Sequence, residues 1–159
     1  MEAYLAAAVD PRITAVVPCI GVQSFAWALD HDSWHSRVGT FQAAVDAAAK
    51  DAGAAVINPE FLRKFYDKVA PGVYSTFDGP AMVPLIAPRP LLVINGDSDP
   101  RTPRPGLDEC LEATAKAYSA AKAKEKFEVR IQEKTAHQVR PEALQHAVSW
   151  FVKTLAPQE

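Results

Sequence analysis

The chain has 159 residues, 48% of them hydrophobic, and a formal net charge of −2. This length and composition predict one globular domain and exclude a disordered chain. The nearly neutral charge argues against nucleic acid as a partner, and the lack of an apolar run of about 20 residues argues against a membrane as one.

The first half of the chain predicts three helices and a strand. The alanine-rich segment Glu2–Val9 is typical of a helix. The run ITAVVPCI at 13–20 predicts a strand that is buried on both faces. Helical composition returns at 43–52 and 60–69, whereas four prolines between 71 and 88 predict a loop.

The second half alternates strands with helices. A short apolar run predicts a strand at 91–95, and apolar residues at helical spacing predict a helix at 106–123. FEVRIQ, at Phe127–Gln132, alternates like an edge strand, and Pro141–Leu155 predicts the last helix. This order is typical of an α/β domain in which the two strands are parallel neighbours or near neighbours.

Cysteine use and the N-terminal composition predict the compartment. Cys19 and Cys110 stand in apolar surroundings and form no C-x-x-C motif, so two reduced, buried thiols are expected. The first residues lack the basic start and the apolar core of a secretion signal. A cytoplasmic protein is therefore expected.

Polar side chains follow both predicted strands of the second half. Asp97 and Asp99 come after the strand in PLLVINGDSDPRTP, and His137 follows the next strand in EKTAHQV. The carboxyl ends of adjacent parallel strands lie about 4.8 Å apart at one edge of a sheet. A carboxylate that accepts from Nδ1–H of an imidazole fixes its tautomer and leaves Nε2 as a general base.

These segments resemble a known family. APRPLLVINGDSDPRTP and KTAHQVRPEALQHAVSWFVKTL resemble the C-terminal half of α/β-hydrolases, closest to the dienelactone hydrolase, acetyl xylan esterase and prolyl-oligopeptidase-like branches. The opening MEAYLAAAVDPRITAVVP resembles the helix and strand that follow the nucleophile. The resemblance implies a mostly parallel sheet of about three strands flanked by helices. By this resemblance, residues 1–159 form a single partial domain, in which 21–88 is a cap or insertion region.

The resemblance also implies a function. Asp99, three residues after Gly96, matches the acid of a catalytic triad, and His137 matches its base. Asp97 would then shape the turn. A serine hydrolase with this pair acts on ester or amide bonds of a small-molecule ester or a peptide, without a metal or an organic cofactor.

The chain departs from the family at the nucleophile. No G-x-S-x-G motif occurs, and Ser24, in GVQSF, lacks the second glycine. We therefore expect the C-terminal portion of a serine hydrolase, inactive by itself; the alternative is a non-catalytic, shortened binding module. Without its partner strand, the segment at 13–20 would be an exposed apolar edge and would favour self-association.

Two other motifs suggest metal chemistry. DSDPRT resembles the D-x-D motif of haloacid-dehalogenase-like phosphatases, but there the first Asp directly follows a strand and here two residues intervene. HDSWH places His31 and His35 at the spacing of a zinc site, without a glutamate or a third ligand. An N-cap role for Asp32 or Ser33 is the simpler interpretation.

Overall fold

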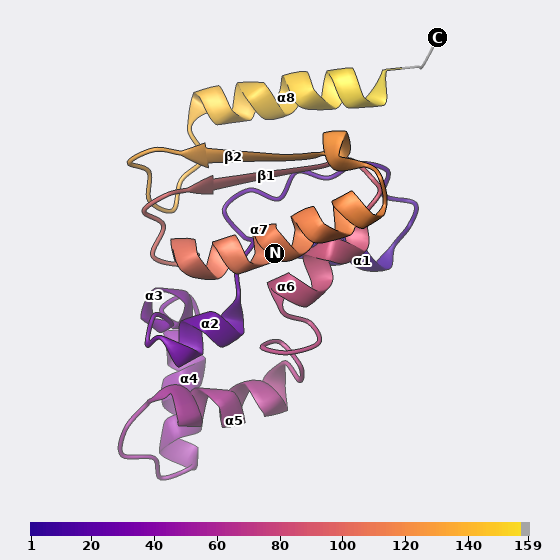
Figure 1. Ribbon diagram of the computed structural model, residues 1–159. Helices are drawn as coiled ribbons and strands as arrows, with labels where there is room; N and C mark the ends of the chain where they lie inside the picture. The colour runs from indigo at the N-terminus through magenta and orange to yellow at the C-terminus, as the bar shows by residue number, and fades with distance from the viewer. Residues whose placement is uncertain (157–159) are drawn as a thin grey trace.

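The computed structural model describes residues 1–156 (Figure 1). Two parallel strands, β1 (Leu91–Gly96) and β2 (Phe127–Gln132), pair without a bulge from end to end. The helices are α1 (Glu2–Val9), α2 (Phe25–Asp30), α3 (His35–Val38), α4 (Gln42–Asp51), α5 (Pro59–Val69), α6 (Gly79–Met82), α7 (Arg104–Ala120) and α8 (Pro141–Leu155), with 3₁₀ helices η1 (Val83–Ile86) and η2 (Lys124–Lys126). None of the described helices is both long enough and apolar enough to cross a membrane.

The strand expected at 13–20 is present as an extended segment beside β1 and not as a regular strand. Leu92 N–H donates to the Val16 carbonyl and Ile94 N–H to the Pro18 carbonyl, both at 3.1 Å, and Ile20 N–H donates to the Ile94 carbonyl at 2.7 Å. An unbroken ladder would need the N–H of residue 18 to donate to the Leu92 carbonyl, and Pro18 has none. The sheet therefore has two regular strands, and the irregular segment 16–20 lies parallel to β1 in a third position.

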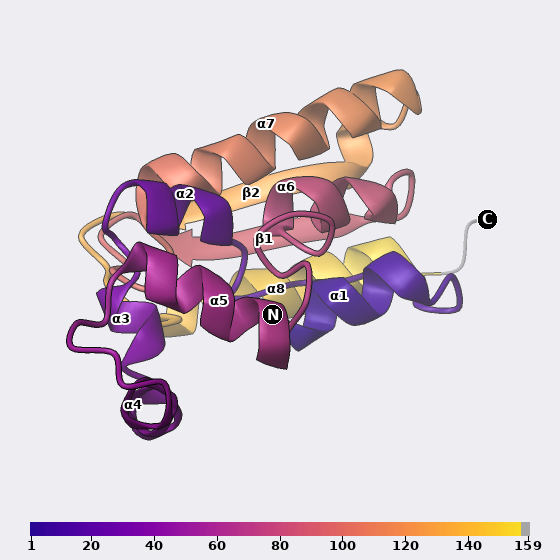
Figure 2. The ribbon, with the colours of Figure 1, turned by 90° about the horizontal axis from the view of Figure 1, so that it is seen from below.

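Helices cover both faces of this sheet, as Figures 1 and 2 show. On one face, α1, α6, η1 and α7 form the main core with Leu91 and Val93. On the other face, α8 packs against Leu92 and Ile94. All five side chains of β1 are fully buried, as is typical of a parallel strand covered on both faces.

The buried residues of α8 on the face that meets the sheet are small. Ala143 and Ala147 are buried against β1. The larger aliphatic residues of this helix lie elsewhere: Leu144, Val148 and Leu155 are 59%, 58% and 57% exposed. Small side chains on the sheet-facing side let the helix approach the strand closely; Leu144, Val148 and Leu155 point away from it, whereas the partly buried Trp150 packs against the same cluster.

Residues 25–69 form four helices to one side of the sheet (Figure 1). They have an apolar cluster of their own, with Phe25, Trp34 and Leu62 among its buried members. The expected loop at 71–88 contains two short helices, α6 and η1. The buried Asp78 carboxylate starts α6 by accepting from Gly79 N–H at 2.8 Å, and it also accepts from Phe25 N–H at 2.7 Å. A cap or insertion role for 21–88 stays a prediction.

Candidate active site

The carboxyl ends of β1 and β2 continue into two loops, the acid loop (97–103) and the histidine loop (133–140). Asp97 accepts hydrogen bonds from the backbone N–H groups of Lys134 at 2.9 Å and Thr135 at 3.1 Å. The hydroxyl of Ser98 and, after it, these two amides hold the pKa of Asp97 below its ordinary value. Asp97 thus fastens the two loops together, which is a larger role than shaping its own turn.

Gly96, the last residue of β1, lies directly against the histidine loop. A Cβ at this position would be 2.1 Å from the carbonyl oxygen of Thr135 and 2.5 Å from that of Ala136. No side chain fits into that space. The glycine therefore sets how closely the histidine loop approaches the end of β1.

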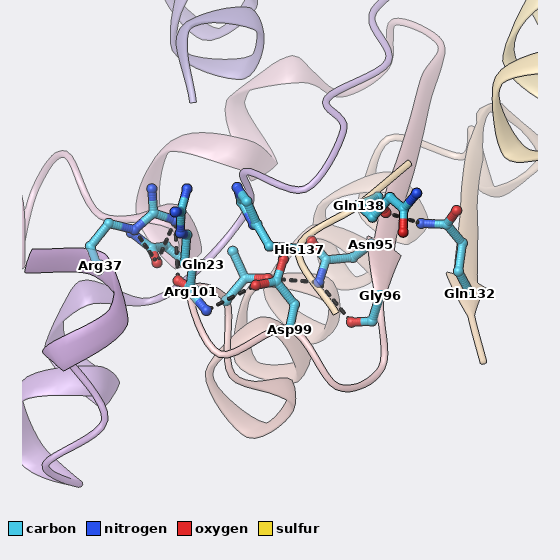
Figure 3. Close-up of polar contacts among 10 residues, drawn as sticks. Gln23, Arg37, Asn95, Gly96, Asp99, Arg101, Gln132, His137 and Gln138 are labelled. Atoms are coloured by element: carbon cyan, nitrogen blue, oxygen red, sulfur yellow. Dashed lines mark hydrogen bonds and ion pairs between the residues drawn. The ribbon is translucent and has the colours of Figure 1, made fainter. Parts of the chain in front are cut away.

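Asp99 and His137 are in direct contact at this edge of the sheet (Figure 3). His137 Nδ1 lies 2.8 Å from Asp99 Oδ2, and the two side chains are 27% and 0% exposed. The other carboxylate oxygen of Asp99 accepts from Arg101 N–H at 2.8 Å. Because a carboxylate accepts at Nδ1, that nitrogen carries the proton, and in the neutral ring Nε2 is the nitrogen with the lone pair.

Within residues 1–156, no other side chain hydrogen-bonds to His137. Asp97 and Asp99 engage different groups, and the described part of the chain has no cluster of three potential metal-ligating side chains. The phosphatase interpretation of DSDPRT therefore has no support in the geometry, since its two aspartates must share one cation.

Two buried polar residues at the ends of the strands hold the loops, and neither was predicted from the sequence. Asn95 Nδ2 donates to Thr102 Oγ1 at 2.7 Å, across the acid loop. Gln132 Nε2 donates to the Gln138 carbonyl at 2.9 Å, and Gln132 Oε1 accepts from Arg140 N–H at 2.8 Å. The available signal for Asn95 was an amide side chain at the end of an otherwise apolar strand; Gln132, at the end of an alternating strand, gave no such signal.

A third unpredicted residue, Arg37 of α3, reaches the acid loop from the 21–88 region (Figure 3). Its Nε and Nη2 donate to Gln23 Oε1 at 3.1 and 2.9 Å, and Nη2 also donates to the Arg101 carbonyl at 3.1 Å. Burial lowers the pKa of Arg37, and the charge of Asp99 opposes that shift. Arg37 therefore ties the helical region to the segment that carries Asp99.

Ser24, Cys19 and Cys110 lie near a strand end or in the core, and none of them hydrogen-bonds to His137. Ser24 is 3% exposed; its hydroxyl accepts from Trp27 N–H at 3.0 Å and donates to Asp78 at 3.2 Å. Burial raises the pKa of the Cys19 thiol and that of the fully buried Cys110 thiol. Ser24 is a helix cap, and the thiols stay protonated.

The HDSWH segment is a connection between helices and not one helix face. His31 follows α2 and stacks on Trp27, whereas His35 begins α3 and stacks on Trp34. The N-cap prediction for Asp32 or Ser33 is wrong, because α3 begins after Trp34 without a side-chain cap. Asp32 instead accepts from Trp34 Nε1 at 2.8 Å.

Solved structures share this fold. No family model and no curated protein sequence matches the chain. The glucuronoyl esterase catalytic domain of Hypocrea jecorina superposes with a TM-score of 0.60 at 20% identity, over 99% of this chain and 42% of the esterase. A carbohydrate esterase family 15 glucuronoyl esterase from Caldicellulosiruptor kristjansonii gives 0.59 at 18% identity, over 99% and 41%. The α/β-hydrolase GrgF from Penicillium sp. sh18 gives 0.58 at 13% identity, over 98% and 60%.

The chain therefore has an α/β-hydrolase-like fold, as its sequence indicated. It spans less than half the length of the two esterases and 60% of the third structure. At these identities the likeness concerns the fold, and the chemistry has to be argued from the residues.

Proposed function

We propose that Asp99 and His137 are the acid and base of a serine hydrolase that acts on ester or amide bonds. The observation that carries the proposal is the 2.8 Å contact between His137 Nδ1 and a fully buried Asp99 carboxylate at the carboxyl edge of the sheet. His137 Nε2 would take the proton of an attacking hydroxyl and later give it to the leaving group. Asp99 would orient the ring and stabilise the imidazolium.

We further propose that the nucleophile comes from residues outside these 159. Met1 lies at the same edge of the sheet, since a Cβ on Gly21 would be 2.6 Å from the Met1 nitrogen. Arg37 is near this nitrogen, since its positive charge acts on it. A G-x-S-x-G elbow preceding Met1 would therefore be delivered close to the acid loop, because Arg37 also contacts the Arg101 carbonyl.

The decisive experiment reads the coding sequence upstream of Met1 and then measures hydrolysis of a nitrophenyl ester. A longer chain with an in-frame G-x-S-x-G is expected to be active and to lose about 10⁴-fold in kcat on Asp99→Asn and about 10⁶-fold on His137→Ala. The 159-residue chain is expected to show little or no turnover. Robust, His137-dependent turnover by the 159 residues alone would refute the external nucleophile.

A non-catalytic α/β-hydrolase-like binding module is the second candidate. One observation favours it: within residues 1–156, no hydroxyl or thiol hydrogen-bonds to His137. In that case no upstream elbow exists, and a longer natural chain carrying intact Asp99 and His137 hydrolyses no ester. The same upstream sequence and the same assay therefore separate the two candidates.

A further inference from the structure

Strand β2 is an open edge of the sheet in the described chain. Its single strand partner is β1, and the middle residue, Val129, is 37% exposed. Hollows of about 500 and 380 Å³ flank β2 where the sheet stops, one lined by Val129, Arg130 and Ile131 and the other by Glu128 with α8 residues. The strand contains no proline and no bulge, which are common devices against edge pairing.

The backbone of β2 fixes which residues can pair with a further strand. Asp97 N–H donates to the Gln132 carbonyl at 3.1 Å. Backbone groups alternate in direction along a parallel strand, so residues 128, 130 and 132 bond toward β1. The N–H and C=O groups of Phe127, Val129 and Ile131 therefore face outward. An added strand must hydrogen-bond to these three residues.

We propose that the partner is a second copy of this chain, with β2 pairing antiparallel to β2 of the other copy about a two-fold axis at Val129. Because the outward N–H and C=O groups belong to odd-numbered residues, odd-numbered residues of the two copies lie opposite each other, and so do even-numbered ones. In this register Val129 meets its own counterpart and Phe127 meets Ile131. Glu128 of each copy then lies opposite Arg130 of the other.

Charge selects this register from those with the same parity. Sliding the other copy by two residues in one direction sets Glu128 against its own counterpart, and sliding it by two residues the other way sets Arg130 against its own counterpart. Like charges directly opposite each other destabilise a strand pair, and opposite charges stabilise it. Glu128 and Arg130 are also a closely spaced pair, because even residues form the non-hydrogen-bonded positions of the new ladder.

The geometry of each copy permits the contact. A two-fold axis perpendicular to the sheet keeps α8 of both copies on the same face, so the two sheets join into one. The Glu128 side chain is 44% exposed and lies 2.6 Å from His146 Nε2, which leaves its second oxygen for Arg130 of the other copy. Pairing runs over residues 127–131, since η2 precedes β2 and the histidine loop follows it. This interface does not depend on the proposed function.

A charge swap tests the register. Sedimentation of the 159-residue chain over a range of concentrations is expected to show a monomer–dimer equilibrium. Arg130→Glu should raise the dimer dissociation constant about tenfold or more, because Glu128 then faces a glutamate twice per dimer. The double variant Glu128→Arg, Arg130→Glu should restore association, and Lys50→Glu on the exposed side of α4 should leave it unchanged.

Hydrogen exchange identifies the edge independently of the variants. The amides of Phe127, Val129 and Ile131 should become protected as concentration rises. Concentration-dependent protection of Val17 and Cys19 instead would place self-association at the edge expected from the sequence and overturn the proposal. A monomer at all concentrations, or a dimer that Arg130→Glu leaves intact, would overturn it as well.

Discussion

The close approach of Gly96 to the histidine loop predicts that Gly96→Ala separates Asp99 from His137. A Cβ at Gly96 would lie 2.1 Å from the Thr135 carbonyl oxygen, and real Cβ atoms essentially never come within 3.0 Å of such an atom. The histidine loop must therefore retreat by about 0.9 Å. Added to the present 2.8 Å between His137 and Asp99, that shift exceeds the usual hydrogen-bond limit of about 3.2 Å.

The strain itself should cost about 1–3 kcal/mol in the free energy of unfolding, so the variant still folds. Nitrogen–proton NMR of the His137 ring reports the outcome directly. The unaltered chain is expected to show the Nδ1–H tautomer with a proton protected from exchange, and Gly96→Ala is expected to lose it. In a longer, active chain the same change should lower kcat by about 100-fold, since a 1 Å misplacement costs about that much.

Gly39→Ala is the matched control for this experiment. A Cβ at Gly39 would meet the His35 carbonyl at 3.5 Å, an ordinary contact, and its φ of −51° suits any residue. This variant should keep both the protected ring proton and the stability of the parent. If Gly96→Ala kept the same ring tautomer and the same protection, the glycine would not control the spacing of the two loops.

Three other measurements test the structural basis of the site. The pKa of Asp97 lies below its ordinary value, chiefly through Ser98. The contribution of Asp97 to stability is therefore present above about pH 4 and is lost as pH falls through the lowered pKa. In urea unfolding measured at several pH values, Asp97→Asn should reduce the fall in stability on the acid side. Asp78→Ala leaves three backbone amides and a hydroxyl without an acceptor and should destabilise the chain by about 3 kcal/mol. An unchanged unfolding midpoint would show that Asp78 does not stabilise the starts of α2 and α6. Pro18→Ala supplies the N–H that the Leu92 carbonyl lacks, and slow exchange of that new amide is expected; fast exchange would show that the ladder stays broken.

Local patterns predicted the second half of the fold closely. The bounds of β2 and α8 are those indicated by FEVRIQ and by Pro141, because alternation and an N-terminal proline are local signals. The pairing of β1 with β2 followed from the crossover rule, and with it the meeting of Asp99 and His137.

Long-range contacts were beyond the sequence. Arg37 reaches the acid loop from α3, 64 residues before its partner Arg101, and no local pattern connects the two. The sheet-facing side of α8 was hidden for a different reason. Apolar spacing shows where large residues gather, whereas the distance between a helix and a sheet selects small ones, here Ala143 and Ala147.

The contacts of Asp99 and His137 also bear on the choice between the two candidate functions. Asp99 is fully buried and accepts from both His137 and Arg101 N–H. Removing one partner of such a carboxylate leaves a buried charge short of a hydrogen bond, which costs stability whether or not the chain is an enzyme. The fold therefore has its own reason to keep Asp99 beside His137. The pair is necessary for a serine hydrolase but does not by itself separate an enzyme from a binding module, so the deciding residue is the nucleophile.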